Sequence, residues 1–159
     1  MVAHKIRVIV VDRTRSPFLK QGESFYLDRI NNYARVEWVE VKSASIKKGR
    51  PEEEVLNVEG EAITRRLMPR DYLIALDRAG HQYDSEELAD WLNKFYMDRG
   101  GWISFVIGGP LGLSRDLMKR AQKVLSLSRL TLTHEMCRLF LLEQIYRAFT
   151  IMKGEKYHK

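Results

Sequence analysis

The sequence predicts an α/β fold in which helices cover both faces of a mostly parallel sheet. Short apolar runs typical of buried strands alternate along the chain with longer segments whose apolar residues recur at helical spacing. The apolar run Phe105-Val106-Ile107 passes directly into a glycine-rich turn and then reaches Ser114, which can cap a helix. A chain of 159 residues can bury a sizeable core, so we expect one domain over residues 1–159.

Apolar runs place the expected strands. They cover residues 5–11, 36–41, 72–76 and 102–107, and a short strand-like run follows at residues 125–132. We expect the third strand to end at Asp77 and a loop to occupy residues 78–83.

Capping residues and helix breakers place five helices. The expected helices begin at Pro17, Pro51, Asp84, Ser114 and Thr133. Asp84 and Glu87 have the spacing of a capping box, the helix from Ser114 is expected to reach Val124, and Gly154 ends the last helix. Residues 139–142 of that helix are all apolar, which indicates burial on more than one side and favours a dimer interface as one explanation.

Positive charge is concentrated at the two ends of the chain. The net charge is +6: residues 1–50 contribute +6, residues 51–100 contribute −6 and residues 101–159 contribute +6. This asymmetry favours a polyanionic partner bound by the ends, although solvated helix faces explain it equally well. The basic loop at residues 42–50 is open to the same two interpretations, a track for a phosphate backbone or a solvated crossover.

Composition excludes several classes of protein. The single cysteine, Cys137, allows no intrachain disulfide and no cysteine-based zinc site, and the four histidines lack metal-ligand spacing. The first apolar run is too short for a signal peptide, and no segment has the length needed to cross a membrane. We therefore expect a cytoplasmic protein without a metal. The glycine-rich stretch at residues 108–112 matches neither a dinucleotide fingerprint nor a phosphate-binding P-loop, so by itself it is either a ligand loop or a tight turn.

Six motifs follow one another along the second half of the chain. They are Leu76-Asp77 with Gly80; Phe105-Val106-Ile107-Gly108-Gly109 with Gly112; Leu125-Ser126-Leu127-Ser128 with Leu130-Thr131; His134; Leu142-Glu143-Gln144 with Tyr146-Arg147-Ala148; and Gly154-Glu155 with Tyr157-His158. In this order they resemble the RlmH family, SPOUT-class methyltransferases that modify N3 of a pseudouridine in large-subunit (23S) ribosomal RNA. The resemblance is dense from residue 72 to the end. The first half matches in element order alone, and Asp12-Arg13 stands where the family usually has Gly-Lys.

The resemblance implies a fold, a cofactor and partners. The fold is a SPOUT domain with a C-terminal trefoil knot, through which the last helix threads. The cofactor is S-adenosylmethionine, and the active site lies at a homodimer interface on a nearly finished ribosome. The residues at positions that match the cofactor site are Leu76, Gly108, Leu127, Ser128, Arg129, Leu130, Thr131 and Leu132. The glycine stretch then forms one wall of a cofactor cleft, where Gly108 has no side chain to obstruct the cofactor.

Methyl transfer to N3 requires that the N3 proton leaves. The candidate catalytic residues are His134, His158, Tyr157 and Glu143, because a histidine titrates near neutral pH and a tyrosine can orient the base. The candidates for contacting RNA phosphate groups are Arg138, Arg147 and Lys153, and Arg129 is a further candidate. Glu143 and Arg147 are four residues apart on the last helix, so an intrahelical ion pair is an equally good interpretation of these two. A non-catalytic RNA- or ribosome-binding protein of the same fold is the alternative function.

Overall fold

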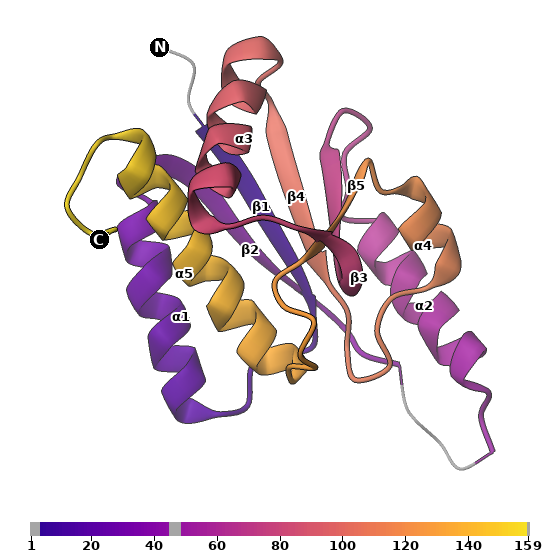
Figure 1. Ribbon diagram of the computed structural model, residues 1–159. Coiled ribbons are helices and arrows are strands. Elements are labelled where there is room, and N and C mark those ends of the chain that lie inside the picture. Colours follow the sequence, from indigo (N-terminus) through magenta and orange to yellow (C-terminus); the bar gives the residue numbers. More distant parts are fainter. Residues whose placement is uncertain (1–3, 45–48, 159) are drawn as a thin grey trace.

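Five parallel strands form the centre of the molecule. The structure is a computed structural model that describes residues 4–44 and 49–158, and within them the strand order is β2-β1-β4-β3-β5 with every pairing parallel (Figure 1). The strands are β1 (His4–Val11), β2 (Ala34–Val41), β3 (Tyr72–Gln82), β4 (Trp102–Ile107) and β5 (Lys123–Ser126). The helices are α1 (Pro17–Ile30), α2 (Glu52–Thr64), α3 (Ser85–Asp98), α4 (Arg115–Arg120) and α5 (His134–Met152).

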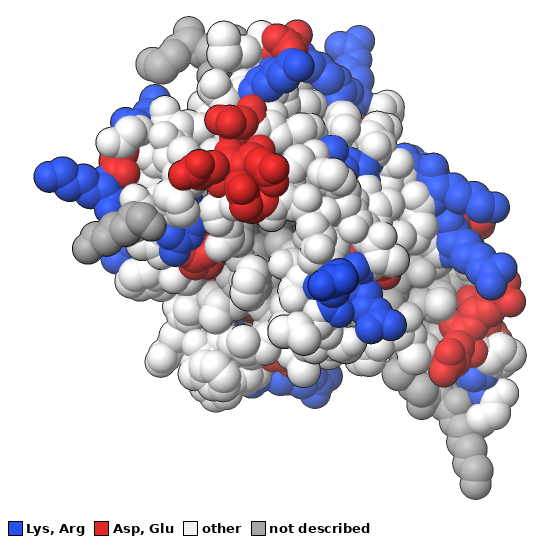
Figure 2. All heavy atoms as spheres, in the orientation of Figure 1, with Lys and Arg blue, Asp and Glu red and all other residues white. Residues whose placement is uncertain are grey.

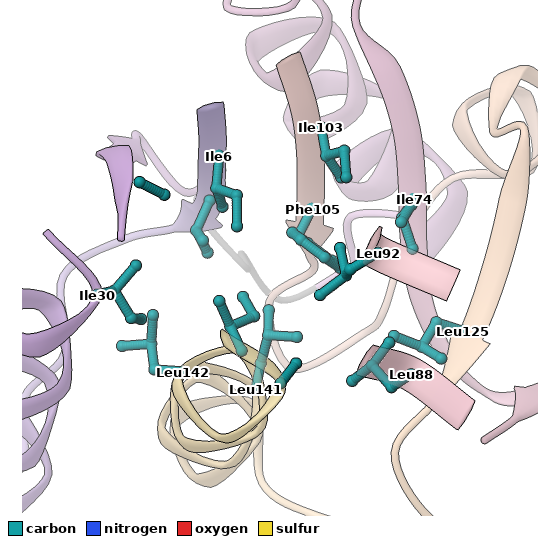
Figure 3. Packing of buried hydrophobic residues seen from close by; sticks show 14 of the residues in the cluster. Ile6, Ile30, Ile74, Leu88, Leu92, Ile103, Phe105, Leu125, Leu141 and Leu142 are labelled. Atoms are coloured by element: carbon teal, nitrogen blue, oxygen red, sulfur yellow. The ribbon is translucent and has the colours of Figure 1, made fainter. Parts of the chain in front are cut away.

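Helices cover both faces of the sheet, as the sequence predicts. Helices α1, α3 and α5 lie on one face, and α2 and α4 lie on the other (Figure 1). Alternate residues of each strand point to opposite faces, so that Ile6 of β1 faces α1 and α5 while Ile9 faces α2. The larger core joins Phe105 to Leu92 of α3 and Leu141 of α5 (Figure 3).

The predicted helix caps are present. The backbone NH of Glu87 donates to Asp84 Oδ1 at 2.8 Å and the NH of Asp84 donates to Glu87 Oε2 at 2.7 Å, a complete capping box. Ser114 and Thr133 accept from the third residue of α4 and α5 respectively. Gly154 follows the end of α5 with φ +69°, a backbone conformation that favours glycine.

The predicted end of the third strand was wrong. Strand β3 continues past Asp77 to Gln82, and its pairing with β5 shifts register between Leu76 and His81, so the intervening residues form a bulge. A β-carbon on Gly80 would lie 2.6 Å from the carbonyl oxygen of Val124, which shows how closely the two strands approach.

The predicted extent of the following helix and strand was also wrong. Helix α4 ends at Arg120, and Val124 belongs to β5 instead of the helix. Gln122 pairs with Leu73 of β3 through two hydrogen bonds, of 2.9 and 2.6 Å, and this pairing draws the chain out of the helix. Strand β5 stops at Ser126, so the predicted strand-like run at 125–132 is mostly a loop, in which the Ser128 hydroxyl accepts from the NH of Leu130.

Helices α1 and α5 lie side by side and run in the same direction (Figure 1). Glu135, at the start of α5, contacts the start of α1, and Tyr33 after α1 donates to Glu155 after α5 at 2.7 Å. A β-carbon on Gly22 would lie 2.8 Å from Leu139, so the glycine lets the two helices approach closely. The threading of α5 through a trefoil knot stays a prediction.

Candidate active site

A cavity of about 540 Å³ opens beside the bulge of β3 and the carboxyl ends of β4 and β5. Its walls are residues 76–78, 107–112, 125, 127, 128, 130–134 and 137. Ligands of parallel α/β sheets bind at this edge, and the volume lies in the range of small-molecule and cofactor sites. The cavity is therefore the candidate active site.

Seven of the residues expected to bind a cofactor line this cavity. They are Leu76, Gly108, Leu127, Ser128, Leu130, Thr131 and Leu132. Arg129 is exposed and does not line it. Leu130 is 75% exposed even though it is apolar, so this wall presents an uncovered hydrophobic side chain at the mouth of the cavity.

The glycine-rich wall has a steric requirement of its own. A β-carbon on Gly108 would collide with the backbone carbonyl group of Gly112, whose φ is +88°. The NH of Gly112 donates to the carbonyl oxygen of Gly109 at 3.0 Å, which fixes this tight turn. Gly108 is therefore needed by the loop itself, whereas the sequence suggested that it spares room for a cofactor.

The sequence did not indicate the contact across the mouth of the cavity. Arg78 Nη1 donates to Thr131 Oγ1 at 3.2 Å and so links the β3 wall to the loop after β5. Asp77 Oδ2 accepts from the NH of Ala79 at 2.9 Å. Asp77 and Arg78 both lie in the β3 bulge, and the lone Gly80 within a strand was the available sequence signal for that bulge.

The first turn of α5 contributes His134 and Cys137 to the cavity. Burial lowers the pKa of His134, and the nearby Arg138 guanidinium lowers it further, so the imidazole is neutral at neutral pH. Burial raises the pKa of the Cys137 thiol to about 11, which keeps it protonated and argues against a nucleophilic role. His134 is thus available inside the cavity as a proton acceptor.

The other catalytic candidates lie together in a second cluster, which we call the tail cluster: Glu143, Arg147, Tyr157 and His158. The Tyr157 hydroxyl donates to Glu143 Oε1 at 3.0 Å, and Arg147 pairs with the same oxygen at 2.5 Å. Arg147 Nη1 lies 3.2 Å from His158 Nδ1, and its guanidinium stacks over the Tyr157 ring. Burial, followed by hydrogen bonds with Tyr26 and Glu143, raises the pKa of Tyr157. The tail cluster lines no part of the cavity in the single chain.

The three basic residues expected to contact RNA have different surroundings. Arg138 is fully buried, with its guanidinium bonded to Thr14 and to the carbonyl of Val11, so the expected phosphate contact was wrong for this residue. Its position on the sheet-facing side of α5, opposite the end of β1, is the physical reason. Arg147 belongs to the tail cluster, and Lys153 is exposed at the end of α5.

Two segments with unusual composition lie near this edge of the sheet. Asp12 follows β1 with φ +68°, a strained conformation for a residue with a side chain, and it pairs with Arg15 at 2.9 Å. In the basic loop at 42–50, residues 45–48 lie outside the described residues, while the NH of Ala44 donates to the buried Glu59 carboxylate at 3.1 Å.

Residues 4–44 and 49–158 contain no group of three His, Cys, Asp or Glu side chains that could hold a metal ion. In that same part of the chain, no helix combines the length and the apolar character needed to cross a bilayer.

Comparison with known proteins gives full-length matches. The family model described as "Predicted SPOUT methyltransferase" matches residues 4–158. The chain is 42% identical over 156 residues to "Ribosomal RNA large subunit methyltransferase H" of Pelotomaculum thermopropionicum, covering 96% of this chain and 98% of that protein. It is also 42% identical over 157 residues to the protein of that name from Bacillus cytotoxicus, covering 97% and 99%.

A solved structure supports the fold. The "Probable Methyltransferase from Bordetella pertussis Tohama I" superposes with a TM-score of 0.58 over 91% of this chain and 96% of that one, at 15% sequence identity. That similarity concerns the fold alone, whereas the family model and the curated relatives match in sequence along nearly the whole chain. The chain belongs to the SPOUT methyltransferase family.

Proposed function

We propose that this chain uses S-adenosylmethionine to methylate N3 of a pseudouridine in large-subunit (23S) ribosomal RNA and that it acts as a homodimer on the ribosome. The observation that carries the proposal is the cavity, because seven of the eight residues at cofactor positions of the resembled family line it. The names of the curated relatives support the substrate class, since each is a ribosomal RNA large subunit methyltransferase.

The cavity fits the proposed cofactor in size and in chemistry. Six leucines line it, namely Leu76, Leu111, Leu125, Leu127, Leu130 and Leu132, and they offer apolar walls for an adenine ring. Backbone groups of the glycine loop and of residues 127, 128 and 130–132 offer hydrogen bonds at the same place. Asp77 adds a carboxylate, which suits a ligand that carries a positive charge. When bound there, the cofactor supplies the methyl group.

His134 is the residue best placed to accept the proton that leaves N3. It lies in the cavity wall and burial keeps its imidazole neutral, so its free ring nitrogen can take up a proton at neutral pH. The cavity walls would hold the target base beside the methyl group, and this positioning supplies a large part of such a rate enhancement. No metal is required for this transfer.

A homodimer would account for two features of the single chain: an exposed apolar surface on α1 and α5, and a tail cluster that lines no part of the cavity. Phe18 and Phe25 on α1 and Met136 and Phe140 on α5 are exposed, and these helices are neighbours. Figure 2 shows that the surface over the lower parts of α1 and α5 is largely uncharged, whereas acidic side chains gather over α3. An apolar surface of this kind is typical of an interface. A second copy there could also bring its tail cluster toward the cavity.

Mass spectrometry of ribosomal RNA tests the proposed function. A strain that lacks this gene should lose one N3-methylated pseudouridine, and the wild-type chain should restore it. Calorimetry with S-adenosylmethionine should show binding by the purified chain. A chain that sediments with ribosomes yet binds no S-adenosylmethionine at millimolar concentration would instead support the non-catalytic RNA- or ribosome-binding alternative.

A further inference from the structure

Arg138 is the largest of the fully buried side chains among the described residues. Burial of a guanidinium in a protein interior is costly unless its donors find partners. An apolar residue would fill the same space without that cost, so stability alone does not explain an arginine at this position.

Two of the guanidinium nitrogens bind the last residue of β1 and the segment that follows it. Arg138 Nη1 donates to Thr14 Oγ1 at 2.9 Å, and Nη2 donates to the carbonyl oxygen of Val11 at 2.5 Å. The Thr14 hydroxyl in turn donates to Glu23 Oε2 of α1 at 2.6 Å. Nε has no hydrogen-bond partner in the part of the chain that the structure describes. The two terminal nitrogens of the arginine therefore connect α5 to the end of β1 and to the residue three positions later.

The neighbouring Glu135 fastens the same two segments. Its Oε1 accepts from the NH of Arg15 at 3.0 Å and from the NH of Ser16 at 3.1 Å. Residues 11–16 are thus attached to one turn of α5 through four hydrogen bonds, two from Arg138 and two to Glu135. Such a connection fixes the rotation and the height of that turn relative to the sheet.

The turn that is held in this way forms a wall of the cavity. His134 and Cys137 belong to it, and both line the cavity from the side of α5. We propose that Arg138 is a positioning residue, which sets the place of the His134–Cys137 wall relative to β1 and thereby shapes the cofactor cavity. The identity of the ligand rests on the proposed function, whereas the position of the wall does not.

The geometry favours arginine over lysine for this task. The planar fork of a guanidinium reaches two acceptors at fixed angles, and here the acceptors are a carbonyl and a hydroxyl three residues apart. A lysine ammonium is a point charge on a flexible stem, so Arg138→Lys would retain one contact and hold the turn less firmly than arginine does. We expect Arg138→Lys to rescue Arg138→Met only in part.

Cys137 reports the position of the wall without any cofactor. It is the single cysteine of the chain, so alkylation by iodoacetamide measures this one site. Arg138→Met removes the two hydrogen bonds to Thr14 and Val11, and this loss should raise the alkylation rate of Cys137 by about tenfold. Thr14→Val, which removes one acceptor, should raise it by a smaller factor.

Two control variants separate positioning from general destabilisation. Arg66→Met removes an exposed arginine after α2 and should leave the Cys137 rate unchanged. Asp71→Ala breaks a buried ion pair with Arg7 in a different part of the sheet, so it destabilises the fold without touching α5. Its Cys137 rate should stay near that of the wild type at a temperature well below unfolding.

Binding of S-adenosylmethionine provides the second measurement. Calorimetry should show weaker cofactor binding by Arg138→Met, and the KM for the cofactor should rise more than kcat falls. The proposal would be overturned if folded Arg138→Met and Thr14→Val alkylate Cys137 at the wild-type rate and bind S-adenosylmethionine with wild-type affinity. Faster alkylation with unchanged cofactor affinity would also overturn it, because a merely structural residue gives that result. If Arg138→Met does not fold, Arg138→Lys and Thr14→Val decide by the same criteria. If the wild-type chain binds no S-adenosylmethionine, the proposed function fails, and alkylation that is faster in Arg138→Met and Thr14→Val than in Asp71→Ala decides whether Arg138 positions the wall.

Discussion

The carbonyl group of Gly112 occupies the place that a β-carbon on Gly108 would need. The contact is between backbone atoms of one tight turn, so neither partner can swing aside as a flexible side chain would. A side chain at residue 108 must therefore displace the turn that forms one wall of the cavity.

Gly108→Ala should distort the cavity and weaken cofactor binding. We expect the free energy of unfolding to fall by about 1–3 kcal/mol, as for other overpacked sites. Gly109→Ala is the matched control, because its β-carbon would meet Glu59 and Val11 at 3.4 Å, a contact that small shifts can accommodate. Calorimetry with S-adenosylmethionine and urea unfolding measure the two effects. Equal behaviour of the two variants would contradict the steric argument.

Removal of Asp71 should destabilise the fold strongly. Its carboxylate pairs with Arg7 in the interior and also accepts from Ser104 at 2.9 Å, so Asp71→Ala removes the buried counter-ion of Arg7 and leaves only the partly exposed Glu37. We expect a loss of about 3–5 kcal/mol in the free energy of unfolding. Glu61→Ala breaks the exposed pair with Arg65, at 3.8 Å, and should cost less than about 0.5 kcal/mol. Urea unfolding of both variants checks the difference, and similar losses would refute it.

Local signals in the sequence were sufficient for most of the fold. Apolar periodicity and caps such as Asp84 and Thr133 act within a few residues, so they identified the elements and the two helical layers. The end of α4 depends instead on Gln122 pairing with Leu73, which is 49 residues away in the chain. A contact of that separation leaves no local trace, and the predicted helix accordingly ran on to Val124.

The sequence predicted the site residues that belong to motifs. It did not predict which side chains of a helix face the sheet. The motifs of the second half located the lining of the cavity. Arg138 was expected to contact RNA phosphate, yet its side chain is fully buried and bonded to the end of β1. A signal for the buried Glu59 was present and went unused, since Val55, Glu59 and Ile63 recur every four residues along the buried side of α2.

Stability should depend on the ionisation of His134. The folded chain holds the pKa of this histidine below its ordinary value of 6.5, through burial and then Arg138, so just below pH 6.5 the unfolded chain binds more protons. The free energy of unfolding therefore gains a contribution as the pH rises through that window, and the gain is complete above it. His134→Gln should reduce this rise, measured by urea unfolding at several pH values.

His4 provides a parallel comparison for the same experiment. Its pKa is also lowered, by burial and then by Lys153, so His4→Gln should remove a separate part of the rise, and the double variant should show the smallest slope. If the free energy of unfolding of His134→Gln rises with pH as steeply as that of the wild type, the imidazole of His134 is not held neutral.

Deletion of residues 157–159 should abolish methylation and leave cofactor binding largely intact. Tyr157 and His158 contact Glu143 and Arg147, away from the cavity lining, so their loss leaves the walls of the cofactor site in place. Calorimetry and mass spectrometry of the ribosomal RNA separate the two effects. Tyr157→Phe, which keeps the ring over Arg147 but loses the hydroxyl bond to Glu143, shows whether the hydroxyl alone is needed. Full methylation by the truncated chain would remove the tail from the mechanism.

A charge on the outer side of α5 should separate the proposed dimer. Phe140 is 41% exposed on a helix whose neighbour α1 also presents uncovered aromatic rings, so Phe140→Glu would place a carboxylate within an apolar interface. Met97→Glu is the matched control, because Met97 is 78% exposed and lies on α3 instead of α1 or α5. Light scattering after gel filtration should show a monomer for Phe140→Glu and a dimer for Met97→Glu. Because the cavity lies within one chain, the monomeric variant should retain cofactor binding while methylation is lost, and a dimeric Phe140→Glu would place the interface elsewhere.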